Sequence, residues 1–448
     1  MINQLTVLRK ENLKIGIPDL KTRLNMLDAI ASWLVKHEEQ IYQALHNDLG
    51  KSQFESYETE IMPLLKEIKF YKRNLKTLMK DRKVTTPFFL FKAQSRIKRK
   101  PYGQVLILAP WNYPLQLSLL PLITALASGN SVVLKPSEIS SHTSELIVSM
   151  FLELDLDPYV CVITGDVAVS QKLLEYPFDK IFFTGSSKVG SLVMAAAAKN
   201  LTPVTLELGG KSPAIVDQNS NINLYAKRIV WGKYINAGQT CIAPDYVLVH
   251  ENQVDDFVAA CVASIENSVL KNLDDYPKII NHQHIERLES YLEGQEVIYG
   301  PDREGDKIMP HLVLNPSLDS KLMQEEIFGP ILPILTYTKI EEVYAIVNSL
   351  PKPLALYIFS EDKAFQEEIM SRIDAGGICI NDTLVHFANS KLPFGGVGQS
   401  GMGSYHGEHG YNCFTRQQAI LKRSSKVELN LRYPPYKDQL KFLKFFSK

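Results

Sequence analysis

Cysteine is scarce in this 448-residue sequence, and the few that occur are not grouped. The five stand far apart, and no two of them form a CxxC pair: Cys161, Cys241, Cys261, Cys379 and Cys413. This spacing excludes a disulfide framework and a thiolate zinc site. It favours a reducing compartment, and we expect a cytoplasmic protein.

The sequence also has no excess of either charge. Lys plus Arg and Asp plus Glu both count 49, so the formal net charge is zero. No general attraction to nucleic acid follows, and we expect no nucleic-acid partner. Residues 1–36 lack a basic-then-apolar signal pattern and predict amphipathic helix.

One long run has no charged residue, from Tyr102 to Leu134. It is interrupted by Pro110, Pro114 and Pro121, and polar residues are scattered along it. A helix that spans a lipid bilayer would not contain these prolines and polar residues without partners. The run therefore predicts a buried strand, loop and helix in a soluble protein.

Short apolar runs alternate with helical stretches up to Glu207. The runs are Val105–Leu108, Ser131–Leu134, Val160–Ile163, Ile181–Phe183 and Val204–Leu206. The helical stretches are Leu115–Ala127, His142–Leu154, Val167–Tyr176 and Lys188–Lys199. This alternation predicts βαβ units and a parallel sheet that is covered on both faces. A second α/β lobe is expected to follow, to about Phe414.

Four candidate functional residues, Asn112, Lys135, Ser186 and Glu207, fall at or just after the carboxyl ends of these runs. Parallel sheets bind ligands at that edge. Local structural roles stay open, because an Asn between prolines often caps a turn and Lys135 precedes a candidate N-cap serine. The stretch Phe183–Gly190 can likewise be a tight turn or a phosphate-binding helix start.

Cys241 is the candidate nucleophile, in Gly238-Gln239-Thr240-Cys241-Ile242-Ala243-Pro244. Upstream lies the carboxylate of Glu207, in Glu207-Leu208-Gly209-Gly210-Lys211. A thiolate with a nearby general base favours covalent catalysis at a carbonyl, followed by hydrolysis of a thioester. Taken alone, a single cysteine is more often a small buried apolar residue.

Basic residues recur at helical spacing in one N-terminal segment: Lys66, Lys69, Lys72, Lys76 and Lys80. A solvated helix face is preferred here over a phosphate site. Residues 87–100 are bounded by prolines, and apolar and polar residues alternate between them. This pattern predicts a protruding hairpin for subunit contact.

The last segment predicts a basic amphipathic helix after Pro434-Pro435. Its lysines share one face and its apolar residues cover the rest: Lys437, Lys441, Lys444 and Lys448, with Leu440, Phe442, Leu443, Phe445 and Phe446. Such a helix can lie on an anionic membrane surface or dock on protein, and docking is preferred.

Seven short motifs occur in one order along the chain. They are Pro110-Trp111-Asn112, Lys135-Pro136-Ser137-Glu138, Phe183-Thr184-Gly185-Ser186, Leu206-Glu207-Leu208-Gly209-Gly210-Lys211, Gly238-Gln239-Thr240-Cys241, Glu325-Glu326-Ile327-Phe328-Gly329-Pro330 and Pro393-Phe394-Gly395-Gly396. Together they closely resemble the aldehyde dehydrogenase superfamily across nearly the entire chain. The short N-terminus and Arg432-Tyr433-Pro434-Pro435-Tyr436 resemble its class 3 branch, which includes fatty and aromatic aldehyde dehydrogenases.

The resemblance implies an α/β fold with a Rossmann-like parallel-sheet cofactor domain, a second α/β catalytic domain and a small β oligomerisation arm. Residues 1–83 and 101–207 are expected to form the NAD(P)-binding domain and residues 208–414 the catalytic domain. Residues 84–100 and 415–448 would form the oligomerisation hairpin and the C-terminal tail. Relatives of this kind also imply a homodimer.

The implied activity is NAD(P)-dependent oxidation of a medium-chain, long-chain or aromatic aldehyde to the acid. Cys241 would attack the aldehyde, and Asn112 with the backbone N–H of Cys241 would form the oxyanion hole. Glu207 would activate the water that hydrolyses the thioester.

The implied cofactor residues are Trp111, Lys135, Glu138, Gly185, Ser186, Gly190, Glu326 and Phe328. Of these, Lys135 and Glu138 match positions near the adenine ribose, whereas Glu326 and Phe328 match positions at the nicotinamide. Glu138 would repel a 2′-phosphate, so NAD is expected first and NADP second.

Two alternatives stay open beside this activity. An acylating enzyme would pass the thioester to coenzyme A, although such relatives generally lack a carboxylate at the position of Glu207. A catalytically silent, cofactor-binding structural protein is the other. A metal site at His406, Glu408 and His409 is not expected, because the resemblance requires no metal.

Overall fold

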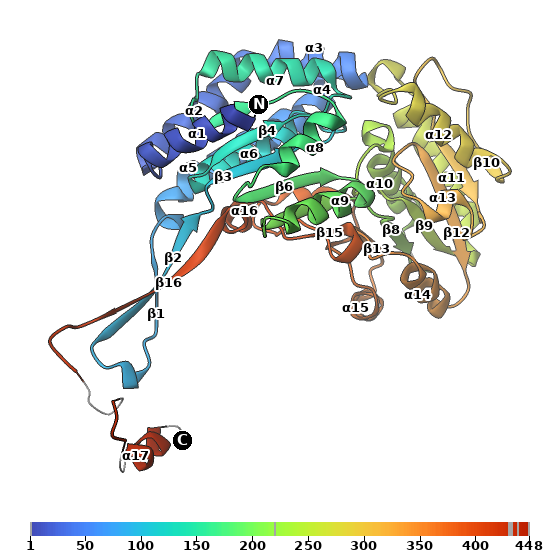
Figure 1. The fold of residues 1–448 in the computed structure, drawn as a ribbon. Coiled ribbons are helices and arrows are strands. Elements are labelled where there is room, and N and C mark those ends of the chain that lie inside the picture. The colour runs from blue at the N-terminus through green and yellow to red at the C-terminus, as the bar shows by residue number, and fades with distance from the viewer. Residues whose placement is uncertain (1, 219–220, 429–432, 437–438, 447–448) are drawn as a thin grey trace.

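The computed structural model describes residues 2–218, 221–428, 433–436 and 439–446. Two helix-covered sheets form the body, and a narrow three-stranded arm extends away from it (Figure 1). The predicted α/β class with a small β arm is confirmed.

The N-terminal segment is helical, as predicted. It contains α1 (Ile2–Ile15), α2 (Leu20–Lys36), α3 (Glu38–Leu49), α4 (Gln53–Ser56), a π-helical turn (Tyr57–Ile61) and α5 (Met62–Leu78). Asp19 caps α2 by accepting a hydrogen bond from the backbone N–H of Thr22 at 2.8 Å. Leu64, Ile68 and Leu75 recur on one face of α5 and are buried, so packing fixes this helix against the body.

The first sheet has six strands in the order β15-β7-β6-β3-β4-β5. Their bounds are β3 (Gln104–Leu108), β4 (Ser131–Lys135), β5 (Val160–Val162), β6 (Lys180–Gly185), β7 (Val204–Leu208) and β15 (Gly401–Met402). All neighbours are parallel except β15, which pairs antiparallel with β7. The five predicted strands are therefore confirmed to within two residues at each end.

Four helices connect these strands: α6 (Gln116–Ser128), α7 (Ser141–Leu154), α8 (Val167–Glu175) and α9 (Ser187–Ala198). Strand β3 shows how the helices cover the sheet. Val105 and Ile107 join an apolar cluster with α2, α5 and α6, whereas Leu106 and Leu108 join one with α8 and α9. Both faces of β3 are thus buried, which explains the uninterrupted apolar run. The charge-free run folds as β3, a loop, α6 and β4, as predicted.

The second sheet has seven strands in the order β10-β11-β12-β9-β8-β13-β14. Their bounds are β8 (Pro213–Val216), β9 (Tyr246–His250), β10 (Val297–Tyr299), β11 (His311–Leu314), β12 (Ile331–Tyr337), β13 (Ala355–Phe359) and β14 (Gly377–Ile380). All pairs except β10–β11 are parallel. A second α/β unit therefore follows Glu207, as expected, while the exact domain boundaries stay a prediction.

The second sheet is surrounded by α10 (Ile222–Tyr234), α11 (Val254–Ser264), α12 (His282–Leu292), α13 (Lys321–Gln324), α14 (Ile340–Ser349) and α15 (Lys363–Arg372). One face shares an apolar cluster with the first sheet, because Ala214 and Val247 belong to the same cluster as Val105. The opposite face packs on α14 and α15. The shared cluster joins the two sheets into one body, and α16 (Gly407–Cys413) returns the chain to the first of them.

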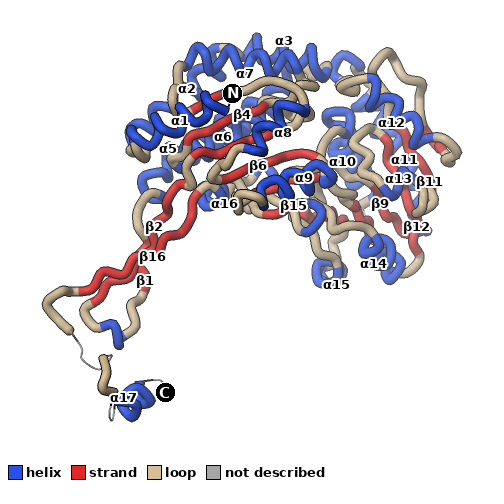
Figure 2. The backbone as a smooth tube through the Cα atoms, viewed as in Figure 1, coloured by secondary structure: helices blue, strands red, loops and turns tan. Residues whose placement is uncertain are grey.

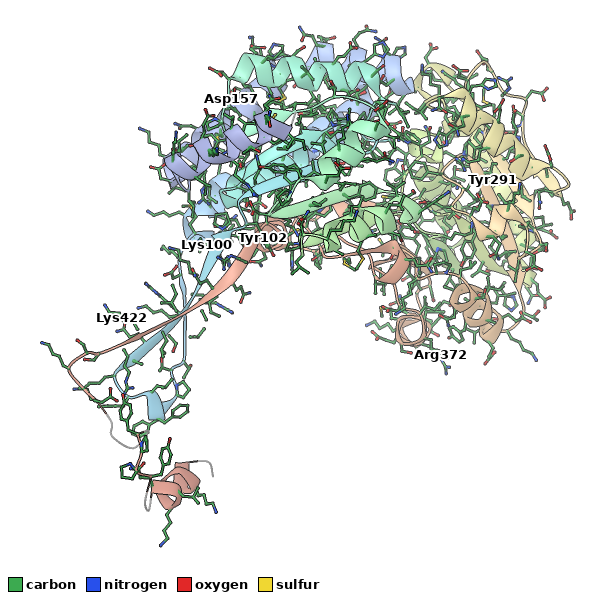
Figure 3. All side chains as sticks on the ribbon, in the orientation of Figure 1. Lys100, Tyr102, Asp157, Tyr291, Arg372 and Lys422 are labelled. Atoms are coloured by element: carbon green, nitrogen blue, oxygen red, sulfur yellow. The ribbon has the colours of Figure 1, made fainter. Side chains whose placement is uncertain are left out.

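The arm consists of β1 (Arg82–Val84), β2 (Ala93–Pro101) and β16 (Thr415–Arg423). Strand β2 lies between the other two, and both pairings are antiparallel. Figure 2 shows the three strands leaving the body together, and in Figure 3 Lys100 marks the base of the arm and Lys422 its outer part. The predicted hairpin over residues 87–100 is wrong in its bounds: that range contains a 3-10 turn (Phe88–Leu90) and the single strand β2, and the hairpin forms because β2 pairs back on β1, which begins at Arg82. Phe88 and Phe89, in the connection between the two strands, are largely exposed.

The C-terminal segment forms helix α17 (Gln439–Phe446), as predicted. Lys441, Lys444 and Leu440 are exposed. Two of the predicted basic residues, Lys437 and Lys448, and also Arg432, lie outside the described residues. None of the described helices is long and apolar enough to span a bilayer.

Candidate active site

A single cavity of about 570 Å³ connects the two strongest candidate residues. Cys241 and Glu207 both line it, together with Thr240, Tyr113 and Tyr405. Most of the remaining wall is apolar and comes from α5, α6, α10 and the segment 384–394. Its volume is in the range of cavities that enclose a small organic ligand.

Glu207 lies in β7, opposite Thr184 of β6 and Gly401 of β15. Its side chain is buried, and neither carboxylate oxygen has a hydrogen-bond partner within the described residues. Burial therefore raises the pKa of this carboxyl well above its ordinary value. Once this carboxyl is ionised, neither oxygen is engaged by a described residue, so it can accept a proton from a water in the cavity.

The chain before Cys241 is held in an unusual backbone conformation. Asn236, Ala237 and Gly238 have φ values of 51°, 49° and 75°. Such values are uncommon for residues with a side chain and are kept only where the surroundings enforce them. At Gly238 a Cβ would lie 2.3 Å from the carbonyl oxygen of Gly329, so only glycine fits there. The turn exposes the thiol to the cavity, and Cys241 keeps a partly accessible surface.

The surroundings of Cys241 disfavour its thiolate in the absence of ligands. Burial, and then the negative charges of Glu326 and Glu207, raise the pKa of this thiol to about 12. The backbone N–H groups of Cys241 and Ile242 act in the opposite direction. Since the thiolate is the nucleophilic form, a neighbouring positive charge or a proton acceptor is needed for reaction.

Asn112 follows β3 and is buried beside the turn that carries the thiol. Its side-chain Nδ2 donates to the carbonyl oxygen of Gln239 at 3.0 Å. An amide nitrogen carries two N–H groups, so one remains for a substrate oxygen. Asn112 therefore lies beside the turn that carries Cys241, although it is not among the residues that line the cavity with Cys241 and Glu207.

Two of the predicted ribose residues, Lys135 and Glu138, form an ion pair with each other. Lys135 is buried at the end of β4, whereas the carboxylate side of Glu138 is partly exposed. This arrangement leaves Glu138 able to reach a ligand beyond the sheet edge.

The candidate phosphate-binding stretch lies at the end of β6 and the start of α9, and its residues have separate roles. Ser186 is the N-cap of α9, and its hydroxyl accepts from the N–H of Val189 at 3.4 Å. Gly185 ends β6, where a Cβ would lie 2.5 Å from the ring of Phe183. Gly190 lets α9 approach β7, because a Cβ there would lie 2.6 Å from Leu208. The turn thus presents a helix N-terminus, which suits a phosphate.

Glu326 and Phe328 lie where the two sheets meet. Glu326 Oε1 is buried with no hydrogen-bond partner in the described part of the chain, and its pKa is raised to about 8, chiefly by burial. The ring of Phe328 contacts Trp111 edge-on at 5.3 Å between centroids. Trp111 also lies 5.0 Å from the ring of His284, a residue that the sequence pattern did not reveal.

These residues fit a dinucleotide. A helix N-terminus follows β6, and a carboxylate stands beyond β4. The Glu326 carboxylate, whose Oε1 has no partner among the described residues, lies against Gly209, where a Cβ would be 1.9 Å from its Oε2. A buried carboxylate oxygen without a donor is costly unless a ligand such as a ribose hydroxyl supplies one.

The structure adds residues that sequence reasoning missed. Tyr405 and His406 line the cavity, and the Tyr405 hydroxyl and His406 Nε2 are buried without hydrogen-bond partners among the described residues. Burial lowers the pKa of His406 to about 3, so this imidazole is neutral. Both lie in Ser404-Tyr405-His406. In the sequence, this stretch suggested only a possible metal site.

The suspected metal residues have other environments. His406 stacks on Phe394 at 5.4 Å, and Glu408 pairs with Arg99 on β2 at 2.6 Å. Within the described ranges, no group of three or more His, Cys, Asp or Glu side chains is arranged to hold a metal ion. All five cysteines carry free thiols.

The wall of the cavity includes the aromatic ring of Tyr113 and the apolar side chain of Leu117. Tyr57 does not line it. Two lysines of the basic helix face, Lys66 and Lys69, stand exposed at its opening. Lys72 instead pairs with Asp28 on α2.

The family model that matches this chain is described as "Aldehyde dehydrogenase family" and covers residues 17–420. The 4,4′-diaponeurosporen-aldehyde dehydrogenase of Staphylococcus aureus is 45% identical over 437 residues, which cover 96% of this chain and 95% of that protein. Aldehyde dehydrogenase family 3 member A2 of Rattus norvegicus is 40% identical over 436 residues, covering 95% of this chain and 90% of the relative.

Solved structures agree with these relatives. The substrate-bound state of Staphylococcus aureus AldH has a TM-score of 0.97 and 43% identity, and the match covers 100% of this chain and 99% of the other. A Mycobacterium tuberculosis aldehyde dehydrogenase complexed with NAD⁺ has a TM-score of 0.82 and 27% identity, covering 91% and 86%. An NADP-dependent glyceraldehyde-3-phosphate dehydrogenase of Bacillus halodurans, complexed with NADP, has a TM-score of 0.85 and 25% identity, covering 94% and 91%.

The fold and the cavity with its thiol and carboxylate therefore define an oxidoreductase of the NAD(P)-dependent aldehyde-oxidising class. The chain belongs to the aldehyde dehydrogenase family. The relatives place it with the class 3 members, as the motifs predicted.

Proposed function

We propose that this enzyme oxidises medium-chain, long-chain or aromatic aldehydes, with Cys241 as nucleophile and Glu207 as general base. One observation carries the proposal. The thiol faces the same cavity as a buried carboxylate that has no hydrogen-bond partner in the described part of the chain, and the remaining wall is mostly apolar. Such a wall favours an aldehyde with an apolar body, because burial of its surface is favourable.

In the first half of the reaction, the Cys241 thiol loses its proton to water in the cavity, and its sulfur attacks the aldehyde carbon and forms a thiohemiacetal. The remaining Nδ2 N–H of Asn112 and the backbone N–H of Cys241 stabilise the negative oxygen. Loss of one such donor typically costs about 10²–10³ in rate. Glu326 and Phe328 would hold the nicotinamide, which would supply the hydride acceptor needed to oxidise the thiohemiacetal to a thioester.

In the second half, Glu207 accepts a proton from a water that attacks the thioester carbon. The acid is released and the thiol regains its proton. Because the pKa of Glu207 is raised, this carboxyl ionises only at higher pH. Once ionised, the carboxylate is a stronger base than an ordinary glutamate.

We propose NAD as the preferred cofactor and NADP as the second. The negative charge of Glu138 disfavours a 2′-phosphate by repulsion, while its ion pair with Lys135 weakens that effect. The related structures with NAD⁺ and with NADP support both cofactors as ligands of this fold.

The arm and the tail support proposals about assembly. The arm leaves the body and exposes Phe88 and Phe89, which favours a homodimer built through this surface (Figure 1). The basic helix α17 is proposed to dock on protein, with weak contact to an anionic membrane as its second role. Light scattering tests the first proposal. Deletion of residues 437–448, followed by vesicle sedimentation, tests the second.

The activity itself is tested by reduced-cofactor absorbance with a panel of aldehydes. We expect turnover with apolar aldehydes, free acid as the product, and no turnover for Cys241→Ala. No turnover by the wild type would favour the silent structural protein. Formation of an acyl-CoA in preference to the free acid would favour the acylating alternative. Full activity of Cys241→Ala would refute the assigned nucleophile.

A further inference from the structure

A buried ion pair lies directly behind the turn that carries Asn112. Lys51 Nζ and Glu60 Oε1 are 2.6 Å apart, and both side chains are fully buried. Neither residue lines the cavity. A buried ion pair is weak evidence for stability, because desolvation of both charges offsets much of their attraction. Its contacts therefore need another explanation.

The second carboxylate oxygen of Glu60 holds the start of α6. It accepts from the backbone N–H groups of Leu115 and Gln116, at 3.1 Å and 2.8 Å. These N–H groups belong to the first turn of the helix and have no partner inside it. A negative charge at this end of a helix is favourable. Glu60 thus fixes the residues that immediately follow Asn112.

Lys51 holds the other side of the same turn. Its Nζ donates to the carbonyl oxygen of Asn112 at 3.3 Å and lies 4.0 Å from the centre of the Tyr113 ring. The same carbonyl oxygen accepts from Asn236 Nδ2 at 2.8 Å. Asn236 belongs to the strained turn before Cys241 and also donates to Gln239 at 3.2 Å.

The same N-terminal segment reaches the thiol turn directly. The carboxylate of Glu55 lies close to the backbone N–H of Asn236, which acts to lower the pKa of this buried carboxyl; Asn236 is one of the residues with positive φ. Residues 51–60 therefore contact both turns, the one with the oxyanion donor and the one with the nucleophile. These two turns come from different sheets, so their relative position is not set by either sheet alone.

We propose that Lys51 and Glu60 are positioning residues for the aldehyde-oxidising reaction. They set the distance between the Asn112 amide and Cys241 and touch neither substrate nor cofactor. The inference rests on the proposed roles of Asn112 and Cys241. Displacement of Asn112 by a fraction of an ångström weakens a hydrogen bond that matters mainly in the transition state, so kcat falls more than KM changes.

The test begins with Glu60→Gln, which replaces the carboxylate that faces the Lys51 ammonium with a neutral amide. We expect kcat to fall about 10- to 100-fold, with the KM values of aldehyde and cofactor changed less than about threefold. Because Glu60→Gln leaves a buried charge unpaired, it can unfold the protein. The double variant Lys51→Met/Glu60→Gln removes both charges and should fold, with the same loss of kcat.

Coupling to Asn112 separates positioning from a general structural role. In an Asn112→Ala background, Glu60→Gln should lower kcat by less than about threefold, since the donor that it positions is already absent. The matched control is Asp48→Asn. Asp48 is also a buried carboxylate that accepts helix N-terminal N–H groups, from His142 and Thr143, and it contacts neither turn. It should keep the wild-type kcat.

The outcomes distinguish a failure of this inference from a failure of the proposed function on which it rests. If Cys241→Ala or Asn112→Ala keeps full activity, the proposed function fails. If both are impaired but Glu60→Gln lowers kcat equally in the presence and absence of Asn112, the positioning role is wrong. An unchanged kcat in the folded double variant would overturn it as well.

Discussion

The hydroxyl groups of Tyr113 and Thr240 lie 2.6 Å apart and join the residue after Asn112 to the residue before Cys241. Both residues line the cavity, so this hydrogen bond lies in its wall. Burial raises the pKa of Tyr113 well above its usual value, and the phenol therefore stays protonated. A direct link thus crosses between the two turns on the cavity side, opposite the buried ion pair of Lys51.

Tyr113→Phe should remove the hydrogen bond between these two turns with little change in the shape of the side chain. One buried hydrogen bond is worth about 0.5–1.5 kcal/mol, so we expect a loss of about 1 kcal/mol in unfolding free energy. We also expect kcat to fall severalfold. Urea unfolding and steady-state kinetics measure the two effects. Tyr57→Phe, on a ring outside the cavity, is the control and should leave both values unchanged.

Thioester hydrolysis should accelerate as pH rises. Glu207 must be ionised to accept a proton, and burial raises its pKa, so the active fraction grows with pH through that raised value. Single-turnover measurement of acid release reports this step. Glu207→Gln should lower the rate by about 10²-fold or more and remove that part of the pH dependence. Glu145→Gln, on an exposed surface of α7, should show the wild-type profile.

Replacement of Glu326 should make the thiol more reactive in the absence of cofactor. Its negative charge raises the pKa of Cys241, so Glu326→Gln lowers that pKa and increases the thiolate fraction. We expect alkylation by iodoacetamide to be severalfold faster. The difference should grow as pH rises through about 8, where Glu326 itself ionises. An equal gain from the neighbouring Glu325→Gln would contradict this explanation.

Glu55 should make stability decrease as the solution becomes more alkaline. Burial raises its pKa to about 7 in the folded protein, above the ordinary value of about 4.3 in an unfolded chain. The protonated form is thus favoured by folding, and its contribution is present at low pH and lost as pH rises through about 7. Glu55→Gln should therefore gain thermal stability relative to wild type between about pH 5 and about pH 8. A constant difference across that range would refute the assignment.

Gly209→Ala should weaken cofactor binding without unfolding the protein. The new Cβ would lie 1.9 Å from Glu326 Oε2, and the flexible end of that side chain can move away. If Glu326 holds the nicotinamide ribose, its displacement should weaken cofactor affinity about tenfold, since a hydrogen bond to a charged group contributes about 1.5–3 kcal/mol. Titration of cofactor fluorescence measures this. Unchanged affinity would show that Glu326 does not contact the cofactor.

The sequence alone determined the strands of the first sheet and the candidate chemistry. Runs such as Val105–Leu108 are apolar throughout because both faces of β3 are covered, and this pattern is local enough to identify. The motifs around Cys241 and Glu207 also identified residues that the structure brings to one cavity. Ser186 was recognisable as a helix start for the same local reason.

Only the tertiary structure revealed Lys51, Glu60 and Asn236. Lys51 and Glu60 are nine positions apart, but they contact residues 112–116, and Asn236 contacts Asn112 across 124 positions. A buried charge leaves no periodic signal in its own segment. Glu55 follows Ser52 with the spacing of a helix capping box, which would suggest a purely local role, whereas its carboxylate reaches Asn236. Local patterns set the elements and the reactive groups. The distance between Asn112 and Cys241 depends on packing between two sheets. The contacts that set this distance come from segments far apart in the sequence, and no local sequence pattern connects those segments.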